Sequence, residues 1–275
     1  MKLIAKMLFE GARRTPEFPG KHNILWHLVR KLPMVDEFQI QSGGAIFSIR
    51  GVEINEFWMA ARGIHSPDIF KNMCELAGDD EVTVWDIGAN IGTVSLPLLA
   101  TKSRIKVVAF EPSPAVCAKL LKNANLNPAL QSRLKIINCA LSDKTGWVEF
   151  YASNEVNNSG IGGIGVASNR VSASFMTFAQ LGSNCTELVS APDIIKIDVE
   201  GHEISVLRGL GEILNKRPLT IIFEHSIYRL KENGTPFGAT SDFLRDKGFK
   251  VSSLDGTEPV DLSKDQDLVA SNAHP

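Results

Sequence analysis

Three features are scarce in this 275-residue sequence: paired cysteines, long apolar runs and an excess of charge of either sign. The formal net charge is −2, so the composition does not indicate the clustered basic face that nucleic-acid binding needs. No apolar run approaches the roughly 20 residues that a helix needs to cross a bilayer. No CxxC spacing occurs, and we expect reduced, buried thiols and no disulfide framework. The four cysteines are Cys74, Cys117, Cys139 and Cys185.

The first ten residues do not have the pattern of a secretion signal. They are amphipathic, but Lys2 and Lys6 break the apolar stretches and no small-residue cleavage pattern follows. We therefore expect a helix that packs on the body of a cytoplasmic protein. A helix lying on a membrane surface is the alternative.

The chain divides into two regions with different patterns. Residues 1–78 combine a basic helix, a proline-interrupted segment, a hairpin over 38–49 and one or two helices over 57–76. We expect them to form an accessory region. From 79 to 275 strands alternate with helices, which predicts an α/β domain with a mostly parallel sheet. The expected strands are 82–87, 105–110, 134–139, 193–198, 219–224, 249–254 and 267–270, and the expected helices are 93–102, 114–125, 201–215 and 238–247.

The most informative motif is a strand that runs into a glycine-rich turn and then a helix, over residues 82–92. Asp86, Gly88, Asn90 and Gly92 occupy alternate positions where the strand ends. Glycine allows a positive φ and lets a ligand approach the backbone, and the helix that follows directs free N–H groups to the same place. The motif predicts a pocket for a nucleotide-like ligand, with an ordinary strand-to-helix connection as the alternative.

A second acid narrows the identity of that ligand. Glu111 follows the strand 105–110, where a carboxylate is placed to accept hydrogen bonds from both hydroxyls of a ribose. Dinucleotide folds use G-x-G-x-x-G, whose middle glycine admits a pyrophosphate. Here the turn is D-x-G-x-N-x-G, and a carboxylate at Asp86 would repel a diphosphate but suit a cationic ligand with an amino group. S-adenosylmethionine fits this pattern better than NAD.

Further acids and histidines follow the fourth and fifth strands of the expected parallel sheet. Ligands bind beyond the carboxyl ends of such strands, so we expect these side chains at the mouth of the cofactor cleft. Buried charges need partners, which favours a functional role, although helix capping accounts well for Glu203. The residues are Asp198, Glu200, His202, Glu203, Glu224 and His225.

One segment departs from the alternation of strands and helices. Residues 152–174 are rich in Ser, Asn and Gly and have almost no large side chains. We expect a long loop there, either a lid over the substrate or a disordered segment.

Four segments together resemble the FkbM family of S-adenosylmethionine-dependent methyltransferases: WDIGANIG at 85–92, AFEP at 109–112, NCALS at 138–142 and IKIDVEGHE at 195–203. The resemblance covers about residues 80–225. It departs at 178–181, where FAQL replaces a Thr-Leu-Asp run that is usual in the family. It implies a Rossmann-like class I methyltransferase fold, whose seven-stranded, mostly parallel sheet has the order 3-2-1-4-5-7-6, with helices on both faces.

The resemblance also implies roles for individual residues. Asp86, Gly88 and Gly92, with Asn90 between them, would hold the methionine end of the cofactor. Glu111 would bind the ribose, Cys139 and Ala140 would border the adenine, and Asp198 would lie near the transferring methyl group.

The implied reaction is O-methylation of a sugar or another small molecule. Removal of the acceptor proton calls for a base, for which His202 and Glu200 are the first candidates and His225 the second. Asp198, Glu200 and Glu224 could instead hold Mg²⁺, which would lower the pKa of the hydroxyl. A non-catalytic cofactor-binding protein of the same fold and a nicotinamide-dependent oxidoreductase are the alternatives. The sequence specifies neither the acceptor nor the oligomeric state.

Overall fold

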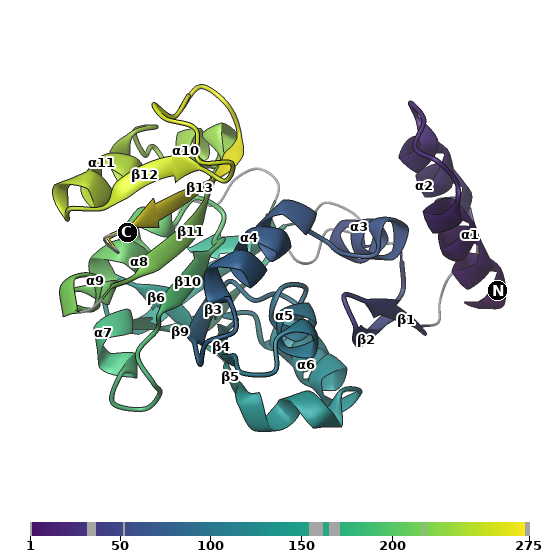
Figure 1. The fold of residues 1–275 in the computed structure, drawn as a ribbon, viewed down its shortest axis with the longest axis horizontal. Coiled ribbons are helices and arrows are strands. Elements are labelled where there is room, and N and C mark those ends of the chain that lie inside the picture. Colours follow the sequence, from purple (N-terminus) through teal and green to yellow (C-terminus); the bar gives the residue numbers. More distant parts are fainter. Residues whose placement is uncertain are drawn as a thin grey trace.

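The computed structural model describes residues 2–31, 37–51, 53–153, 162–164, 171–216 and 218–272. A central sheet of seven strands carries helices on both faces, and an N-terminal group of helices with a small hairpin extends from one end (Figure 1). Within these ranges, none of the helices has both the length and the apolar character needed to cross a membrane.

The central sheet has the order β12-β13-β11-β10-β3-β4-β5. The five strands from β11 to β5 are parallel, and β13 runs antiparallel to both β11 and β12. Helices cover both faces, which explains why the five parallel strands are mostly apolar. The strands are β3 (Thr83–Ile87), β4 (Lys106–Phe110), β5 (Leu134–Ile137), β10 (Ile194–Ile197), β11 (Thr220–His225), β12 (Lys250–Ser253) and β13 (Gln266–Ser271).

The numbers in this order differ from the expected 3-2-1-4-5-7-6 because β1, β2 and β6 to β9 belong to two other sheets. Counted within the central sheet alone, the strands from the β5 edge are the third, second, first, fourth, fifth, seventh and sixth in the chain. The strand order therefore reverses between β3 and β10. There the register places Asp86 beside Lys196.

Successive side chains of each strand point to opposite faces of the sheet, and each face has its own apolar core. Val84, Val107 and Ile194 belong to a core with residues of α4, α5 and α6. Trp85 and Ile195 belong to the opposite core, with residues of α8 and α11. The helices after β3 are α5 (Ser95–Thr101), α6 (Pro114–Asn125), η1 (Pro128–Arg133), α7 (Gly182–Cys185), α8 (Glu203–Leu210), α9 (Ile213–Lys216), α10 (Ile227–Glu232) and α11 (Ala239–Asp246).

A second sheet, of order β6-β9-β7-β8, occupies the region where the sequence predicts a loop. That prediction is wrong for the described part of 152–174. Strand β7 ends at Ser153, β8 spans Gly162–Ile164, and β9 begins at Val171. Residues 154–161 and 165–170 lie outside the described residues. Apart from β8, this sheet consists of β6 (Ala140–Ser142), β7 (Gly146–Ser153) and β9 (Val171–Leu181).

The second sheet borders the carboxyl edge of the central one. The hydroxyl of Thr177 in β9 donates a hydrogen bond to the carbonyl oxygen of Pro112 at 2.9 Å, directly after the end of β4. The two residues lie 65 positions apart in the chain, so no local sequence pattern predicts this contact. Regular β7–β9 pairing places Trp147 opposite Phe178 and Phe150 opposite Phe175.

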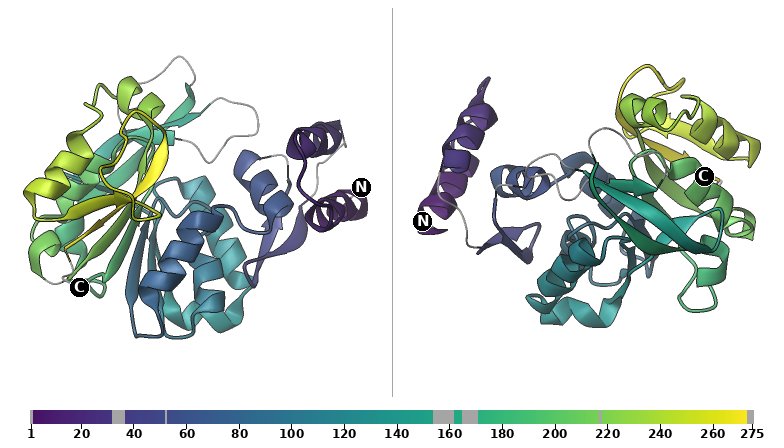
Figure 2. Two further views of the ribbon diagram at one scale, coloured as in Figure 1. Left: turned by 45° about the horizontal axis from the view of Figure 1, so that its top comes forward. Right: turned by 180° about the vertical axis from the view of Figure 1, so that it is seen from behind.

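The N-terminal region shares a core with the helices on one face of the central sheet. Phe9, Phe47 and Phe57 form one apolar cluster with Ile91 and Leu96. Figure 2 shows α1 and α2 at the end of the molecule away from β12 and β13. The elements are α1 (Lys2–Arg14), α2 (Lys21–Lys31), β1 (Phe38–Ser42), β2 (Ala45–Ile49), α3 (Ile54–Arg62) and α4 (Pro67–Ala77).

Gly88 sets how closely the turn after β3 approaches β10. Its φ is +78°, its N–H donates to the carbonyl of Phe110 at 3.0 Å, and a Cβ would collide with the carbonyl oxygen of Asp198. Backbone atoms have no rotamer through which to move away, so the reversal point of the sheet requires glycine here.

We expect Gly88→Ala to reduce the free energy of unfolding by about 2–4 kcal/mol, from left-handed strain and overpacking together. Gly248→Ala is the matched control, because its φ is +85° and no atom lies within 4 Å of the place that a Cβ would occupy. The control should lower the free energy of unfolding by only about 1–2 kcal/mol, from the left-handed backbone strain alone. Equal losses in urea unfolding would show that the contact with Asp198 is unimportant.

Candidate active site

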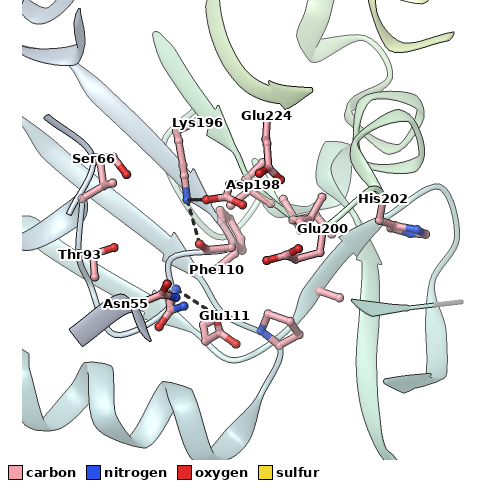
Figure 3. A pocket seen from close by; sticks show the side chains of 18 of the residues that line it. Asn55, Ser66, Thr93, Phe110, Glu111, Lys196, Asp198, Glu200, His202 and Glu224 are labelled. Carbon is pink, nitrogen blue, oxygen red and sulfur yellow. Dashed lines mark hydrogen bonds and ion pairs between the residues drawn. The ribbon is translucent and has the colours of Figure 1, made fainter. Parts of the chain in front are cut away.

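A pocket lies beyond the carboxyl ends of β3, β4, β10 and β11, where the strand order reverses (Figure 3). Gly88, Asn90, Glu111, Asp198 and Glu224 line it from these strand ends. The pocket therefore lies beyond the carboxyl ends of the parallel strands, where the sequence predicts the cofactor cleft. The individual side chains differ from that prediction in several respects.

Lys196 forms the floor of the pocket. Its Nζ lies 3.2 Å from Oδ1 of Asp86 and 3.5 Å from Oδ2 of Asp198, and it donates to the carbonyl oxygen of Gly88 at 2.9 Å. Lys196 is 4% exposed and Asp86 is 1% exposed. Burial alone would lower the pKa of the lysine, but the two carboxylates outweigh it and raise that pKa above its usual value.

Asp86 lies behind the pocket instead of lining it. Its Oδ2 accepts a hydrogen bond from the hydroxyl of Ser95 at 2.5 Å, and its Oδ1 faces Lys196. Asp86 therefore does not reach the pocket in this structure, where Lys196 takes the position of a cation beside it, and its contact with a ligand amino group stays a prediction. Gly92 does not line the pocket either, since a Cβ there would meet Leu120 and Leu96.

Glu111 is held in place by the backbone around it. Its Oε2 accepts from the N–H of Asn90 at 3.0 Å, and its Oε1 accepts from the N–H of Ser113 at 2.8 Å. Burial raises the pKa of Glu111 to about 7 despite these bonds. Asn90 has a φ of +52° and its side chain accepts from the N–H of Ile91, so the turn is rigid before any ligand arrives.

The IKIDVEGHE segment provides two pocket acids and one acid that stabilises the loop. Asp198 and Glu200 line the pocket, and Oε2 of Glu200 lies 2.6 Å from Nε of Arg229. Burial, with help from Asp198, raises the pKa of Glu200 to about 7. Glu203 accepts from the N–H groups of Val199 and Gly201 at 3.3 and 3.0 Å, so it stabilises the turn before α8.

The two histidines predicted as bases have other partners. Nε2 of His202 lies 3.0 Å from the hydroxyl of Ser142, and Figure 3 shows its ring pointing away from Lys196 and Asp198. His225 is buried at 1% exposure with its Nε2 3.0 Å from the carbonyl oxygen of Leu262. Neighbouring strand residues point to opposite faces, so Glu224 lines the pocket while His225 lies outside it. The expectation that His225 faces the cleft is wrong.

Cys139 and Ala140 line the pocket beside Leu141 and Phe110, and together they form its apolar wall. Burial raises the pKa of the Cys139 thiol to about 12, so the thiol is neutral. The side-chain amide of Asn138 donates to the carbonyl oxygen of Glu111 at 2.7 Å. This bond ties the apolar wall to the end of β4.

Lys196 and four residues of the accessory region are among the lining residues that were not predicted from the sequence. Lys196 is hidden in an apolar strand, although its place opposite Asp86 follows from the parallel register. The other four come from the accessory region, where no local pattern marks them: Asn55, His65, Ser66 and Ile69.

The expected Mg²⁺ ligands do not form a metal site in the described part of the chain. No group of three or more His, Cys, Asp or Glu side chains there has the arrangement to hold an ion. Asp198 and Glu200 face Lys196 and Arg229, which already supply positive charge.

Comparison with known proteins identifies the family. The family described as Methyltransferase FkbM domain matches residues 86–251. The chain belongs to the FkbM methyltransferase family. The hexuronic acid methyltransferase AglP of Haloferax volcanii is 31% identical over 196 residues, which are 70% of this chain and 75% of AglP. The 2-O-methyltransferase NoeI of Sinorhizobium fredii is 27% identical over 202 residues, covering 67% of this chain and 81% of NoeI.

A solved FkbM methyltransferase from Methylobacillus flagellatus is also similar to this chain. The sequence identity is 15% and the TM-score is 0.47. The alignment covers 91% of this chain and 59% of that one.

Lys196→Met should destabilise this FkbM methyltransferase strongly, because it leaves Asp86 buried without its cation. Breaking a buried pair by removing one partner costs about 3–5 kcal/mol. Lys106→Met is the control, since the Lys106 side chain is 56% exposed and its pair with Glu81 lies at the surface. The control should cost less than about 1 kcal/mol in urea unfolding. Similar losses in the two variants would contradict the structural role given to Lys196.

The buried acids make stability depend on pH. Burial raises their pKa values, to about 7 for Glu111, Glu200 and Glu203, about 6 for Asp267 and about 9 for Glu224. Each of them binds its proton more tightly in the folded state, so its contribution is complete below the unfolded pKa and is lost as pH rises through the folded pKa. The lowered pKa values of His65 and His202 oppose this trend below about pH 6.5.

We therefore expect the ligand-free protein to melt several degrees lower at pH 8 than at pH 5.5. Glu224→Gln imitates the protonated acid and should reduce the change of melting temperature with pH. Glu81→Gln, at the surface, should leave that change as it is in the wild type. Calorimetric scans across this range provide the measurement, and a melting temperature that rises with pH would contradict it.

Proposed function

We propose that the chain is an S-adenosylmethionine-dependent methyltransferase that transfers a methyl group to a hydroxyl of a sugar or related small molecule. The observation that carries the proposal is the buried Glu111, held by two backbone N–H groups at the rim of a glycine turn. A carboxylate fixed in this way is suited to accept hydrogen bonds from two adjacent ribose hydroxyls.

The pocket has the features that this cofactor would need. Cys139, Ala140 and Phe110 offer an apolar wall for an adenine ring. Gly88 brings backbone close to the site without a side chain. Oε2 of Glu224 is buried with no hydrogen-bond partner among the described residues, so a polar or cationic group of a ligand would satisfy it.

The charges around the pocket favour a cation over a diphosphate. Asp198, Glu200 and Glu224 line the pocket, while Lys196 is occupied by Asp86 and the carbonyl oxygen of Gly88. A sulfonium reduces the repulsion between these acids, whereas a pyrophosphate would increase it. This difference supports S-adenosylmethionine over a nicotinamide cofactor.

The bound cofactor supplies an electrophilic methyl group. The chain's own contribution is to hold the acceptor hydroxyl in line, to keep water out and to receive one proton. Asp198 is the pocket acid nearest to the floor, and its pairing with Lys196 at 3.5 Å fixes its position. Glu200 is oriented by Arg229, which leaves it able to position a neutral hydroxyl through a hydrogen bond.

The acceptor class rests on the names of two relatives, a hexuronic acid methyltransferase and a 2-O-methyltransferase. We propose a sugar hydroxyl as the acceptor, without a metal ion, since Lys196 and Arg229 already compensate Asp198 and Glu200. Methyl transfer that is unchanged in EDTA would support the metal-free mechanism. Loss of transfer in EDTA, restored by Mg²⁺, would contradict it.

S-adenosylhomocysteine should raise the melting temperature and NADH should not, because only a ligand of the folded state stabilises it. Glu111→Gln should weaken S-adenosylhomocysteine binding about 10- to 100-fold through the loss of a charged hydrogen bond. Glu75→Gln, at an exposed helix position, is the control and should bind normally. Stabilisation by NADH alone, or an unaffected Glu111→Gln variant, would overturn the proposed cofactor site.

A further inference from the structure

The pocket has a wall that comes from outside the methyltransferase core. Asn55 of α3, the connection between α3 and α4, and Ile69 of α4 all line it. His65 and Ser66 lie in that connection, and the role that we infer for them below rests on the function proposed above.

The chain fixes the connection between α3 and α4 at both ends. Gly63 ends α3 with a φ of +87° and a backbone bond to the carbonyl of Met59 at 2.9 Å. Pro67 begins α4, where its preset φ suits the first helical position. Ile69 and Met73 of α4 then pack with Val84 in the core on the Lys196 face of the sheet. His65 is therefore anchored beside the strand ends that carry Asp198.

Ser66 interacts with His65 instead of capping its own helix. It occupies the N-cap position of α4, where serine usually accepts a hydrogen bond from the first turn, but its side chain makes no capping bond. Its hydroxyl lies 2.9 Å from Nδ1 of His65. The hydroxyl therefore pairs with the histidine instead of making the usual capping bond.

His65 has the properties of a base that is held in one orientation. Nδ1 faces Ser66, and Nε2 makes no hydrogen bond to any residue that the structure describes. Burial lowers the pKa of His65, Asp198 opposes that change, and Lys196 and Arg62 add to it, so the ring is neutral near pH 7. His202 also lines the pocket beside a serine, but its ring points away from Lys196 and Asp198 (Figure 3), and Glu200 is paired with Arg229.

We propose that His65 is the general base that takes the proton of the acceptor hydroxyl, and that Ser66 is a positioning residue that holds it in the required tautomer. The Nδ1–H donates to the hydroxyl oxygen of Ser66, which leaves the Nε2 lone pair for the acceptor. As the acceptor oxygen bonds to the methyl carbon, its proton passes to Nε2 and the electron pair of the breaking carbon–sulfur bond goes to the sulfur. The products are a methyl ether, a neutral thioether and an imidazolium, whose charge the carboxylate of Asp198 stabilises.

The first test uses p-nitrophenyl β-D-glucuronide as the acceptor with the full-length enzyme. His65→Gln should lower kcat by about 10²- to 10⁴-fold, the usual contribution of a general base, with S-adenosylhomocysteine affinity within about twofold of the wild type. Imidazole added to His65→Ala should restore part of the rate, which a purely structural residue would not show. His27→Gln, at an exposed position on α2, should have wild-type activity. Unchanged kcat in His65→Gln would overturn the proposal.

The second test needs no acceptor and so separates this proposal from the proposed function. In ¹⁵N-histidine-labelled protein, long-range proton–nitrogen spectra at pH 7 should show His65 neutral with the proton on Nδ1. Ser66→Ala should shift the ring towards the Nε2–H form. An imidazolium at pH 7, or an Nε2–H tautomer in the wild type, would overturn the role of His65. If the spectra agree but the wild type does not methylate the glucuronide, the proposed acceptor class fails, while the tautomer assigned to His65 and its pairing with Ser66 are supported independently of it.

Discussion

A single buried ammonium group joins the parts of this molecule that create its site. Lys196 binds the strand that precedes the glycine turn through Asp86, the turn itself through the carbonyl of Gly88, and the start of the acidic segment through Asp198. All three partners meet where the strand order reverses. A buried lysine needs groups of opposite charge beside it, and two buried or half-buried carboxylates need a cation. None of these groups is therefore stable there alone.

The remaining acids in the pocket give the site its selectivity. Once Lys196 is occupied, Glu111, Glu200 and Glu224 keep raised pKa values because burial disfavours their charged forms. A ligand that carries positive charge would lower this cost, and one that carries phosphates would add to it. The N-terminal region completes the pocket from the side opposite the acidic segment, so cofactor and acceptor would meet between two separate parts of the chain.

Much of this arrangement could be predicted from the sequence because it depends on local patterns. The alternation of strands and helices, the turn at Gly88 and the acid at Glu111 follow from residue types at fixed spacings. The positions of Lys196 and His225 also follow from strand alternation, since Lys196 lies opposite Asp86, and Glu224 and His225 must point to opposite faces. The role of Asp86 as a structural partner follows once Lys196 is recognised.

Other parts depend on contacts between residues far apart in the chain, which no single-sequence pattern specifies. The contribution of His65 and Ser66 requires α4 to pack against the sheet. The pairing of β7 with β9 joins residues 146–153 to residues 171–179, across a segment whose small polar residues predict a loop. The glycine turn at Gly88 could be predicted because it is formed by consecutive residues, whereas its binding of a cofactor stays a prediction.

The pocket at the point where the strand order of the central sheet reverses is the proposed binding site of S-adenosylmethionine. Hydrogen–deuterium exchange with and without S-adenosylhomocysteine tests it most directly, because it locates the ligand without assuming an acceptor. Peptides that cover residues 86–94, 110–113 and 138–141 should exchange more slowly when the ligand is bound. Protection confined to other segments, or no protection at saturating ligand, would contradict it.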